Sequence, residues 1–285
     1  MLTTQTAAPR PESPYSRLSI RSRQAAAASS RPRISEPILA MDRGPLSAAS
    51  LFKRAKRLEK QYGQRLRRIA RHVGDIVSGF EAGTQAAADA MAGALRRYAD
   101  TLDPWARAVG ERMVAEVAAA DRSAWRKLSA SIGRGLRREI DDAPTGQATR
   151  EALDRQVGLI KSLPLEAAER VHRLTLEGIS QGRRAEDIAA EIAATGEVTK
   201  SRATLIARTE VSRTATELTK ARAQHVGSTH FVWRTAGDSD VRASHRKLNG
   251  QTFRWDDPPE CDPGHRALPG GIWNCRCWCE VIVPD

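Results

Sequence analysis

The sequence predicts an α+β protein: an extended, mostly helical N-terminal region is followed by a helical segment and a small C-terminal α+β module. Only 5% of the 285 residues are aromatic, while Ala, Arg and charged residues are plentiful, which favours helices over a β-sandwich. From Leu51 onward, apolar residues recur at steps of three and four, as they do along one face of a helix. After Gly227 the sequence becomes rich in Gly, Pro and Asp, and Phe231–Trp233 is typical of a strand.

Composition limits the classes of protein that this chain can be. Its length allows one domain with an extension, or two small domains. No window approaches the roughly 18 uncharged apolar residues that a membrane helix needs, so we expect no membrane partner. All four cysteines follow residue 260, which indicates no disulfide framework and favours the cytoplasm. The net charge of +12 predicts attraction to polyanions, of which nucleic acid is the commonest.

Residues 1–48 are predicted to form a disordered basic tail. Six prolines are spread among Ser, Ala and Arg in this segment, and large apolar side chains are few. Such a segment buries too little apolar surface to offset the entropy lost on ordering.

Residues 49–145 are predicted to form a helical assembly region that begins with a long amphipathic helix. Its apolar face comprises Leu51, Ala55, Leu58, Tyr62, Leu66, Ile69, Val73, Ile76 and Phe80. Its basic face carries one acid, Glu59, among nine cations: Lys53, Arg54, Lys56, Arg57, Lys60, Arg65, Arg67, Arg68 and Arg71. Asp103-Pro104 suits the first turn of a later helix.

The turn-forming run from Asp141 to Gly146 predicts a domain boundary. Beyond it, the domain 146–285 is expected to contain a helical part, 149–226, and an α+β module, 227–285. The helical part divides into helices at about 149–162, 165–180, 185–194 and 200–226. The module has a short helix at about 238–248 and strands at about 251–255 and 275–283.

Several short motifs in this second half occur in a distinctive order. They comprise Arg208, Thr209 and Glu210, then Trp233, then Asp240, Arg242, His245 and Gly250, then Pro269-Gly270, and finally Asn274, Cys275, Arg276 and Cys277. Together these residues resemble the Mu F-like minor head proteins of tailed bacteriophages, also called the head morphogenesis family. The resemblance covers roughly residues 165–283. In that family a His often precedes the Asn-Cys-Arg-Cys run, whereas Ile272 and Trp273 stand there in this chain.

The resemblance implies a structural virion or procapsid protein that acts beside the portal in head assembly, and in DNA packaging, retention or ejection. It implies portal or capsid protein as partner, and a location in the phage head after assembly in the cytoplasm of the infected bacterium. It implies no characterised catalytic reaction, so we do not expect an enzyme.

The cysteines allow two interpretations. Cys275, Cys277 and Cys279 alternate, so on a strand they would share one face, and Cys261, His245 or His265 could complete a tetrahedral zinc site. Alternatively, the thiols pack as small buried hydrophobes in a reducing compartment. The spacing is not that of a CxxC knuckle, and we favour packing.

His245 also allows two interpretations. In a metal-dependent hydrolase, Asp238, Asp240 and His245 would serve as metal ligands or general base. In a structural role, Asp240 would cap the short helix and His245 would hydrogen-bond to the strand that contains Trp233. We favour the structural role.

The basic face of the first helix could follow the phosphates of packaged double-stranded DNA. No aromatic residues alternate with its charges, which argues against base stacking. The alternatives are a solvated helix face, or a face that pairs with an acidic protein.

Overall fold

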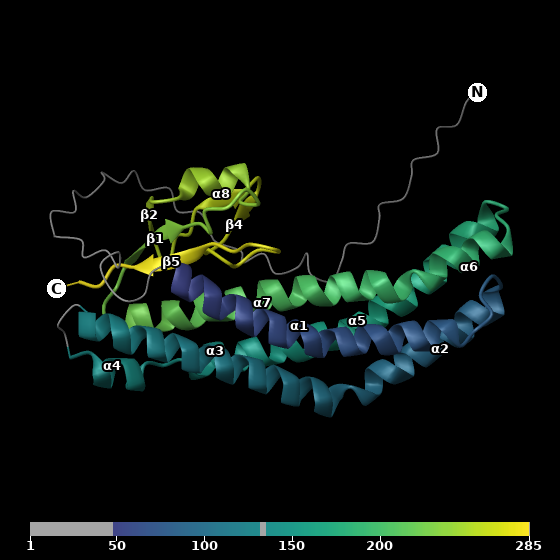
Figure 1. Ribbon diagram of the computed structural model, residues 1–285, viewed down its shortest axis with the longest axis horizontal. Coiled ribbons are helices and arrows are strands. Elements are labelled where there is room, and N and C mark those ends of the chain that lie inside the picture. Colours follow the sequence, from purple (N-terminus) through teal and green to yellow (C-terminus); the bar gives the residue numbers. More distant parts are fainter. Residues whose placement is uncertain (1–47, 132–134, 285) are drawn as a thin grey trace, which may run out of the picture. The chain divides into compact units, whose positions relative to one another are not determined.

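The computed structural model describes residues 48–131 and 135–284, with side chains from Ala55 onward and without that of Ser131. The predicted tail, residues 1–48, therefore lies outside the described side chains. The described residues belong to one compact unit, and they confirm the α+β class. Its helices, shown in Figure 1, are α1 (Ala48–Ser78), α2 (Gln85–Thr101), α3 (Asp103–Ser131), α4 (Arg137–Asp142), α5 (Gly146–Ser180), α6 (Ala185–Ala193), α7 (Thr195–His225) and α8 (Ala243–Leu248).

Helices α1, α2, α3, α5 and α7 enclose one hydrophobic core. Helix α1 packs along α7, and α2 packs along α5. The core joins side chains from all five helices, including Leu66, Leu95, Met113, Leu159 and Ile206. It therefore contains residues from both sides of the boundary predicted between residues 145 and 146.

The apolar face predicted for α1 is buried as expected. Leu58, Tyr62, Leu66, Ile69 and Val73 are all less than 9% exposed. The helix ends at Ser78, and Phe80 then packs against the same core from the following turn. The spacing of apolar residues alone thus located the side of α1 that faces the core.

The predicted break between residues 162 and 165 is wrong, because α5 continues through Pro164 to Ser180. Proline has no N–H, so the carbonyl of Ile160 loses its usual intrahelical donor. On either side of it, Leu163, Ala167 and Val171 are buried in the core. Their packing holds one continuous helix despite the lost bond. The predicted break at Gly182 is confirmed, with a φ of +65° at that residue.

The C-terminal module contains a three-stranded antiparallel sheet in the order β2 (Thr252–Arg254), β1 (His230–Arg234), β5 (Trp278–Val281). A separate two-stranded ribbon joins β3 (Glu260–Asp262) and β4 (His265–Arg266). A second core joins this module to helices α3, α4 and α7. Its residues include Trp125, Ile140 and Ala223 from the helices, and Phe231, Trp233, Trp255, Cys261, Cys279 and Val281 from the module.

Two predicted elements in the module begin later than expected. The last strand starts at Trp278 instead of residue 275, so Cys275 and Cys277 lie in the preceding loop. The short helix starts at Ala243 instead of residue 238. Before β5, the backbone amide of Asn274 binds Thr209 of α7, and before α8, the carboxylates of Asp238 and Asp240 bind Arg276.

Candidate functional site

Residues 268–277 form a loop, called the cysteine loop below, that lies against α7. The line of hydrogen bonds between this loop and α7 is called the seam. The Thr209 hydroxyl accepts a hydrogen bond from the Asn274 amide at 3.0 Å, and the Thr216 hydroxyl donates to the Pro269 carbonyl at 2.7 Å. The Arg213 guanidinium donates to the Gly271 carbonyl at 2.6 and 3.1 Å. These bonds attach residues 269–274 to α7, directly before the segment 275–277 that the structure leaves outside β5.

Arg208 connects this seam to the first helix. Its Nη1 donates to Oδ1 of Asn274 at 2.5 Å, and its Nε donates to Oε1 of Glu59 on α1 at 3.0 Å. Asn274 has a φ of +61°, a left-handed conformation that Asn adopts more readily than most residues. One motif residue thus contacts the helical region and the loop together.

Glu210 is the fully buried centre of a polar network between helices. Its carboxylate accepts hydrogen bonds from Arg155 at 2.8 Å, Gln156 at 2.8 Å and Arg213 at 2.9 Å. Gln156 in turn accepts a bond from the Tyr62 hydroxyl at 2.8 Å. Because Arg213 also holds Gly271, Glu210 positions the residue that anchors the cysteine loop.

The motif residues after Trp233 contact the loop 268–277 on the side away from α7. Arg276 forms ion pairs with Asp238 at 2.6 Å and Asp240 at 3.2 Å, and Arg242 donates to the Trp273 carbonyl at 2.8 Å. Gly250 has a φ of +81°, which favours glycine there. Trp233 is fully buried in the second core.

The predicted helix cap at Asp240 is wrong. The residue that precedes α8 is Arg242, which makes no side-chain capping bond. Asp240 and Asp238 instead bind Arg276, since a guanidinium offers them a stronger, charge-assisted partner than a helix N–H. Both carboxylates are thereby directed to Arg276, which gives no support to their use as metal ligands with His245.

Trp273 directly precedes the Asn-Cys-Arg-Cys run. The Arg202 guanidinium lies over its ring, 4.6 Å from the centroid, and that of Arg213 lies 6.0 Å away. Its indole therefore attaches the loop to α7 through cation–π contacts.

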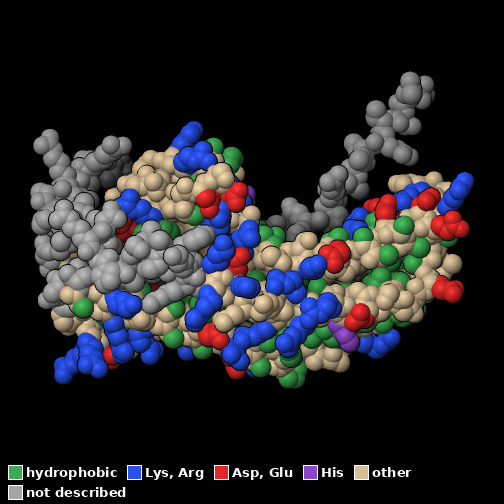
Figure 2. All heavy atoms as spheres, in the orientation of Figure 1, with side chains coloured by type: hydrophobic (Ala, Val, Ile, Leu, Met, Phe, Trp, Pro, Cys, Tyr) green, Lys and Arg blue, Asp and Glu red, His purple; other side chains and the backbone are tan. Residues whose placement is uncertain are grey.

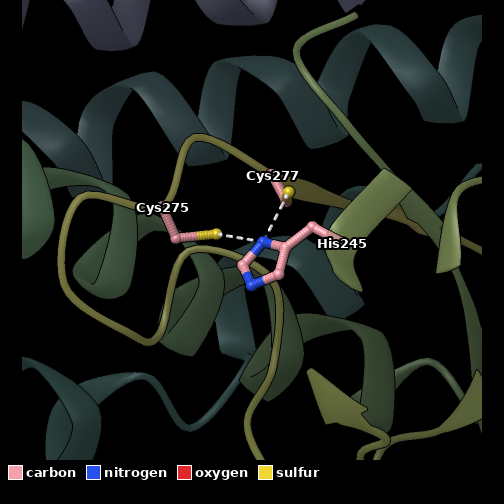
Figure 3. A group of neighbouring side chains, drawn as sticks. All are labelled: His245, Cys275 and Cys277. Carbon is pink, nitrogen blue, oxygen red and sulfur yellow. Dashed lines mark hydrogen bonds between the residues drawn. The ribbon is translucent and has the colours of Figure 1, made fainter. Parts of the chain in front are cut away.

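The side chains of His245, Cys275 and Cys277 lie close together. His245 comes from α8, and the two cysteines come from the end of the loop, just before β5. The Nδ1 atom of His245 lies 3.4 Å from Sγ of Cys277 and 3.5 Å from Sγ of Cys275. Figure 3 shows both sulfurs directed at this one nitrogen. All three side chains are buried, and their donor atoms lie within 4.8 Å of one another.

The other two predicted metal ligands are placed differently. Cys261 is buried on β3, and a hydrogen bond with its thiol is one of the influences that raise the pKa of His245. The His265 side chain is exposed, and only its backbone carbonyl takes part, as acceptor from Sγ of Cys261 at 3.4 Å. The structure thus gathers His245, Cys275 and Cys277 into one group, with Cys261 buried in the same core, and leaves the His265 side chain exposed.

Without a bound ion, the group forms a charged hydrogen-bonded cluster. Burial acts to lower the pKa of His245, but hydrogen bonds with Cys261 and Cys275 outweigh it and raise the pKa to about 9. A hydrogen bond from Cys277 and another from His245 hold the pKa of Cys275 well below its ordinary value. The pKa of Cys277 is raised, because it donates to Cys275 and is buried. The cluster is therefore a thiolate beside an imidazolium.

The structure places the predicted DNA-contact residues on α1 in three groups. Lys56, Arg57, Lys60, Arg68 and Arg71 are exposed. Arg65 and Arg67 are half-buried, and Arg65 lies 3.9 Å from Glu116 of α3. The side chains of Lys53 and Arg54 lie outside the described residues. Figure 2 shows Lys and Arg side chains gathered over the part of the surface where Figure 1 draws α1.

Three residues that the sequence did not single out as site residues complete this region: Arg213, Thr216 and Asp262. Arg213 follows Glu210 by three positions, which is a helical contact spacing that the sequence displays. Thr216 and Asp262 carry no such signal, because their partners are distant in the chain.

Comparison with known proteins supports the predicted resemblance. Residues 169–280 match the model of the family described as Phage Mu protein F like protein. This match lies within the region 165–283 where the motifs predicted the resemblance, and it confirms that resemblance.

A protein of Haemophilus influenzae described as uncharacterized is 36% identical to the chain over 121 residues. That similarity covers 42% of this chain and 26% of the relative, so the chain spans about a quarter of the length of the protein it matches. No solved structure matches the chain. None of the helices in residues 48–131 and 135–284 is both long and apolar enough to cross a membrane.

Proposed function

We propose that the chain is a structural, non-enzymatic minor head protein of a tailed bacteriophage, which acts near the portal in head assembly. The observation that carries this proposal is the match of residues 169–280 to the Mu F-like family. The placement of the motif supports it. Arg208 and Thr209 bind Asn274 of the loop 268–277, and Glu210 binds Arg213, which in turn binds Gly271. The recognisable residues therefore attach this loop to α7, and we infer that the module so formed docks on a partner.

Portal or capsid protein is the proposed partner. The chain would assemble in the cytoplasm of the infected bacterium and remain in the head, with a role in packaging, retention or ejection of DNA.

The test is coexpression of the full chain with the portal protein of the same phage. Copurification at a fixed ratio is expected, whereas separate elution, or turnover of DNA or peptidoglycan by the purified chain, would contradict the proposal.

Contact with packaged DNA is a second proposed function, and the exposed cations of α1 favour it. Arg57, Lys60, Arg68 and Arg71 follow one another at helical spacings and share one stripe of α1. At about 1.5 Å of rise per residue, this stripe is roughly 21 Å long, enough to lie beside several phosphates. Glu59, the one acid within the basic face, is paired with Arg208 and so does not oppose phosphate there.

Replacing these four residues by Gln should weaken binding to duplex DNA equally for all sequences. Each phosphate that a replaced side chain no longer neutralises should reduce the slope of log affinity against log salt by about 0.9. The measurement is a salt titration of binding by fluorescence anisotropy. If each of the four residues binds one phosphate, the slope should fall by about 3.6.

The matched control replaces four exposed arginines on α2 and α4 by Gln: Arg96, Arg97, Arg137 and Arg138. It removes the same charge from other places, so it should leave most of the slope intact. Equal slopes for both variants would mean that α1 is not the DNA-binding surface, and would leave an acidic protein as its partner.

A further inference from the structure

We propose that His245, Cys261, Cys275 and Cys277 bind a single zinc ion that fixes the cysteine loop to the C-terminal module. In a tetrahedral site with Zn–S bonds of about 2.3 Å and Zn–N bonds of about 2.05 Å, a nitrogen and a sulfur ligand lie about 3.5 Å apart. The two measured separations from Nδ1 of His245 are 3.4 Å to Cys277 and 3.5 Å to Cys275. The donor atoms are thus already spaced as ligands of one ion.

Hydrogen bonds alone do not account well for two sulfurs beside one imidazole nitrogen. In either charge state of the ring, Nδ1 of an imidazole has one proton or one lone pair, so it forms one good hydrogen bond. Here two sulfurs approach that nitrogen at nearly equal distance. A cation placed among the three atoms would bind all of them at once.

The opposite side of the imidazole ring supplies an independent indication. Nε2 of His245 is buried and has no hydrogen-bond partner among the described residues. It lies 3.6 Å from Oδ1 of Asp262, which is itself held by a bond of 2.7 Å from the Ser244 hydroxyl. A metal on Nδ1 places the ring proton on Nε2, facing this carboxylate. Carboxylates commonly orient zinc-bound histidines in this way.

Cys261 is the fourth ligand in this proposal. It is buried in the same core as Cys275 and Cys277, and its sulfur would approach the other three donor atoms when the ion binds. Three sulfurs and one imidazole are a donor set that favours zinc over the harder cations. The backbone amide of Gly270, which donates to Sγ of Cys275 at 3.3 Å, would stabilise that sulfur as a thiolate.

Bound zinc would attach the loop 268–277 to the C-terminal module as well as to α7. The motif on α7 holds residues 269–274 from one side, and the ion would hold Cys275 and Cys277 from the other. Because the ligands come from α8, β3 and the loop, binding of the ion and folding of the module would be coupled.

Metal analysis of full-length chain purified without chelators tests this proposal. We expect about one zinc per chain, and its loss in the Cys275→Ser, Cys277→Ser double variant. Cys279→Ser is the matched control, because Cys279 is also a buried cysteine but lies outside the group. That variant should keep its zinc. A metal-free wild-type chain that does not take up added zinc would overturn the proposal, and so would equal zinc content in all three proteins.

Two further measurements remain informative if the double variant fails to fold. Cobalt substituted into the wild-type chain should give the visible absorption and sulfur-to-metal charge-transfer bands of a tetrahedral site with several thiolates. Asp262→Asn should weaken zinc affinity by about 10- to 100-fold, measured by chelator competition, because it removes the carboxylate partner of His245. Octahedral cobalt spectra, or unchanged affinity in Asp262→Asn, would contradict the assigned ligands and their support.

Discussion

Leu66→Asp should prevent the chain from folding. Leu66 is fully buried on the face of α1 that packs into the shared core. Removal of the leucine side chain costs about 2–5 kcal/mol, and an unpaired carboxylate in that place adds several kcal/mol more. The sum is comparable with the whole stability of a typical domain, about 5–15 kcal/mol.

Urea unfolding followed by circular dichroism measures this effect. Gln64→Asp, two residues earlier, is the matched control, because Gln64 is exposed on the same helix and receives the same new charge. It should change stability by less than about 0.5 kcal/mol. A wild-type unfolding midpoint in Leu66→Asp would show that the assigned face of α1 is wrong.

Asp121→Ala should destabilise the chain by about 3–5 kcal/mol, because it leaves a buried guanidinium without its counterion. Arg222 on α7 is 1% exposed, and its Nε donates to Asp121 of α3 at 2.7 Å. The same side chain also donates to the Ile140 carbonyl of α4, and Thr219 donates to Asp121 at 2.7 Å. One pair thus joins three helices near the C-terminal module.

An exposed pair provides the comparison for that prediction. Arg126 and Asp141 form an ion pair of 2.9 Å between α3 and α4, with side chains 50% and 37% exposed. Asp141→Ala should therefore cost no more than about 1 kcal/mol. Thermal unfolding of both variants decides the matter. Equal destabilisation by the two substitutions would mean that burial of the Asp121–Arg222 pair has no special effect.

Periodicity predicted the parts of this fold that depend on local sequence. The buried side of α1 follows from apolar residues three and four positions apart, such as Leu58, Tyr62 and Leu66. The start of α3 at Asp103 follows from the Asp-Pro pair. Local rules failed at Pro164, because the helix there is maintained by tertiary packing that outweighs the missing hydrogen bond.

The sequence predicted most of the residues that belong to the site, but not how they contact one another. The motif identified Arg208, Thr209, His245 and the cysteines, but nothing local indicates that Thr209 bonds to Asn274, 65 residues later. The alternation of Cys275, Cys277 and Cys279 suggested one strand face. In the structure, β5 begins only at Trp278, and two of these cysteines lie in the preceding loop, where they meet His245.

The protein content of purified heads tests the central claim most directly. Heads of the phage that encodes this chain would be isolated on a density gradient, and the chain would be quantified by mass spectrometry relative to the portal protein. The account predicts that the full chain is present at a low and constant ratio to portal, in procapsids or in mature heads. Its absence from both, while it remains abundant in the same lysate, would contradict the proposed role as a head protein.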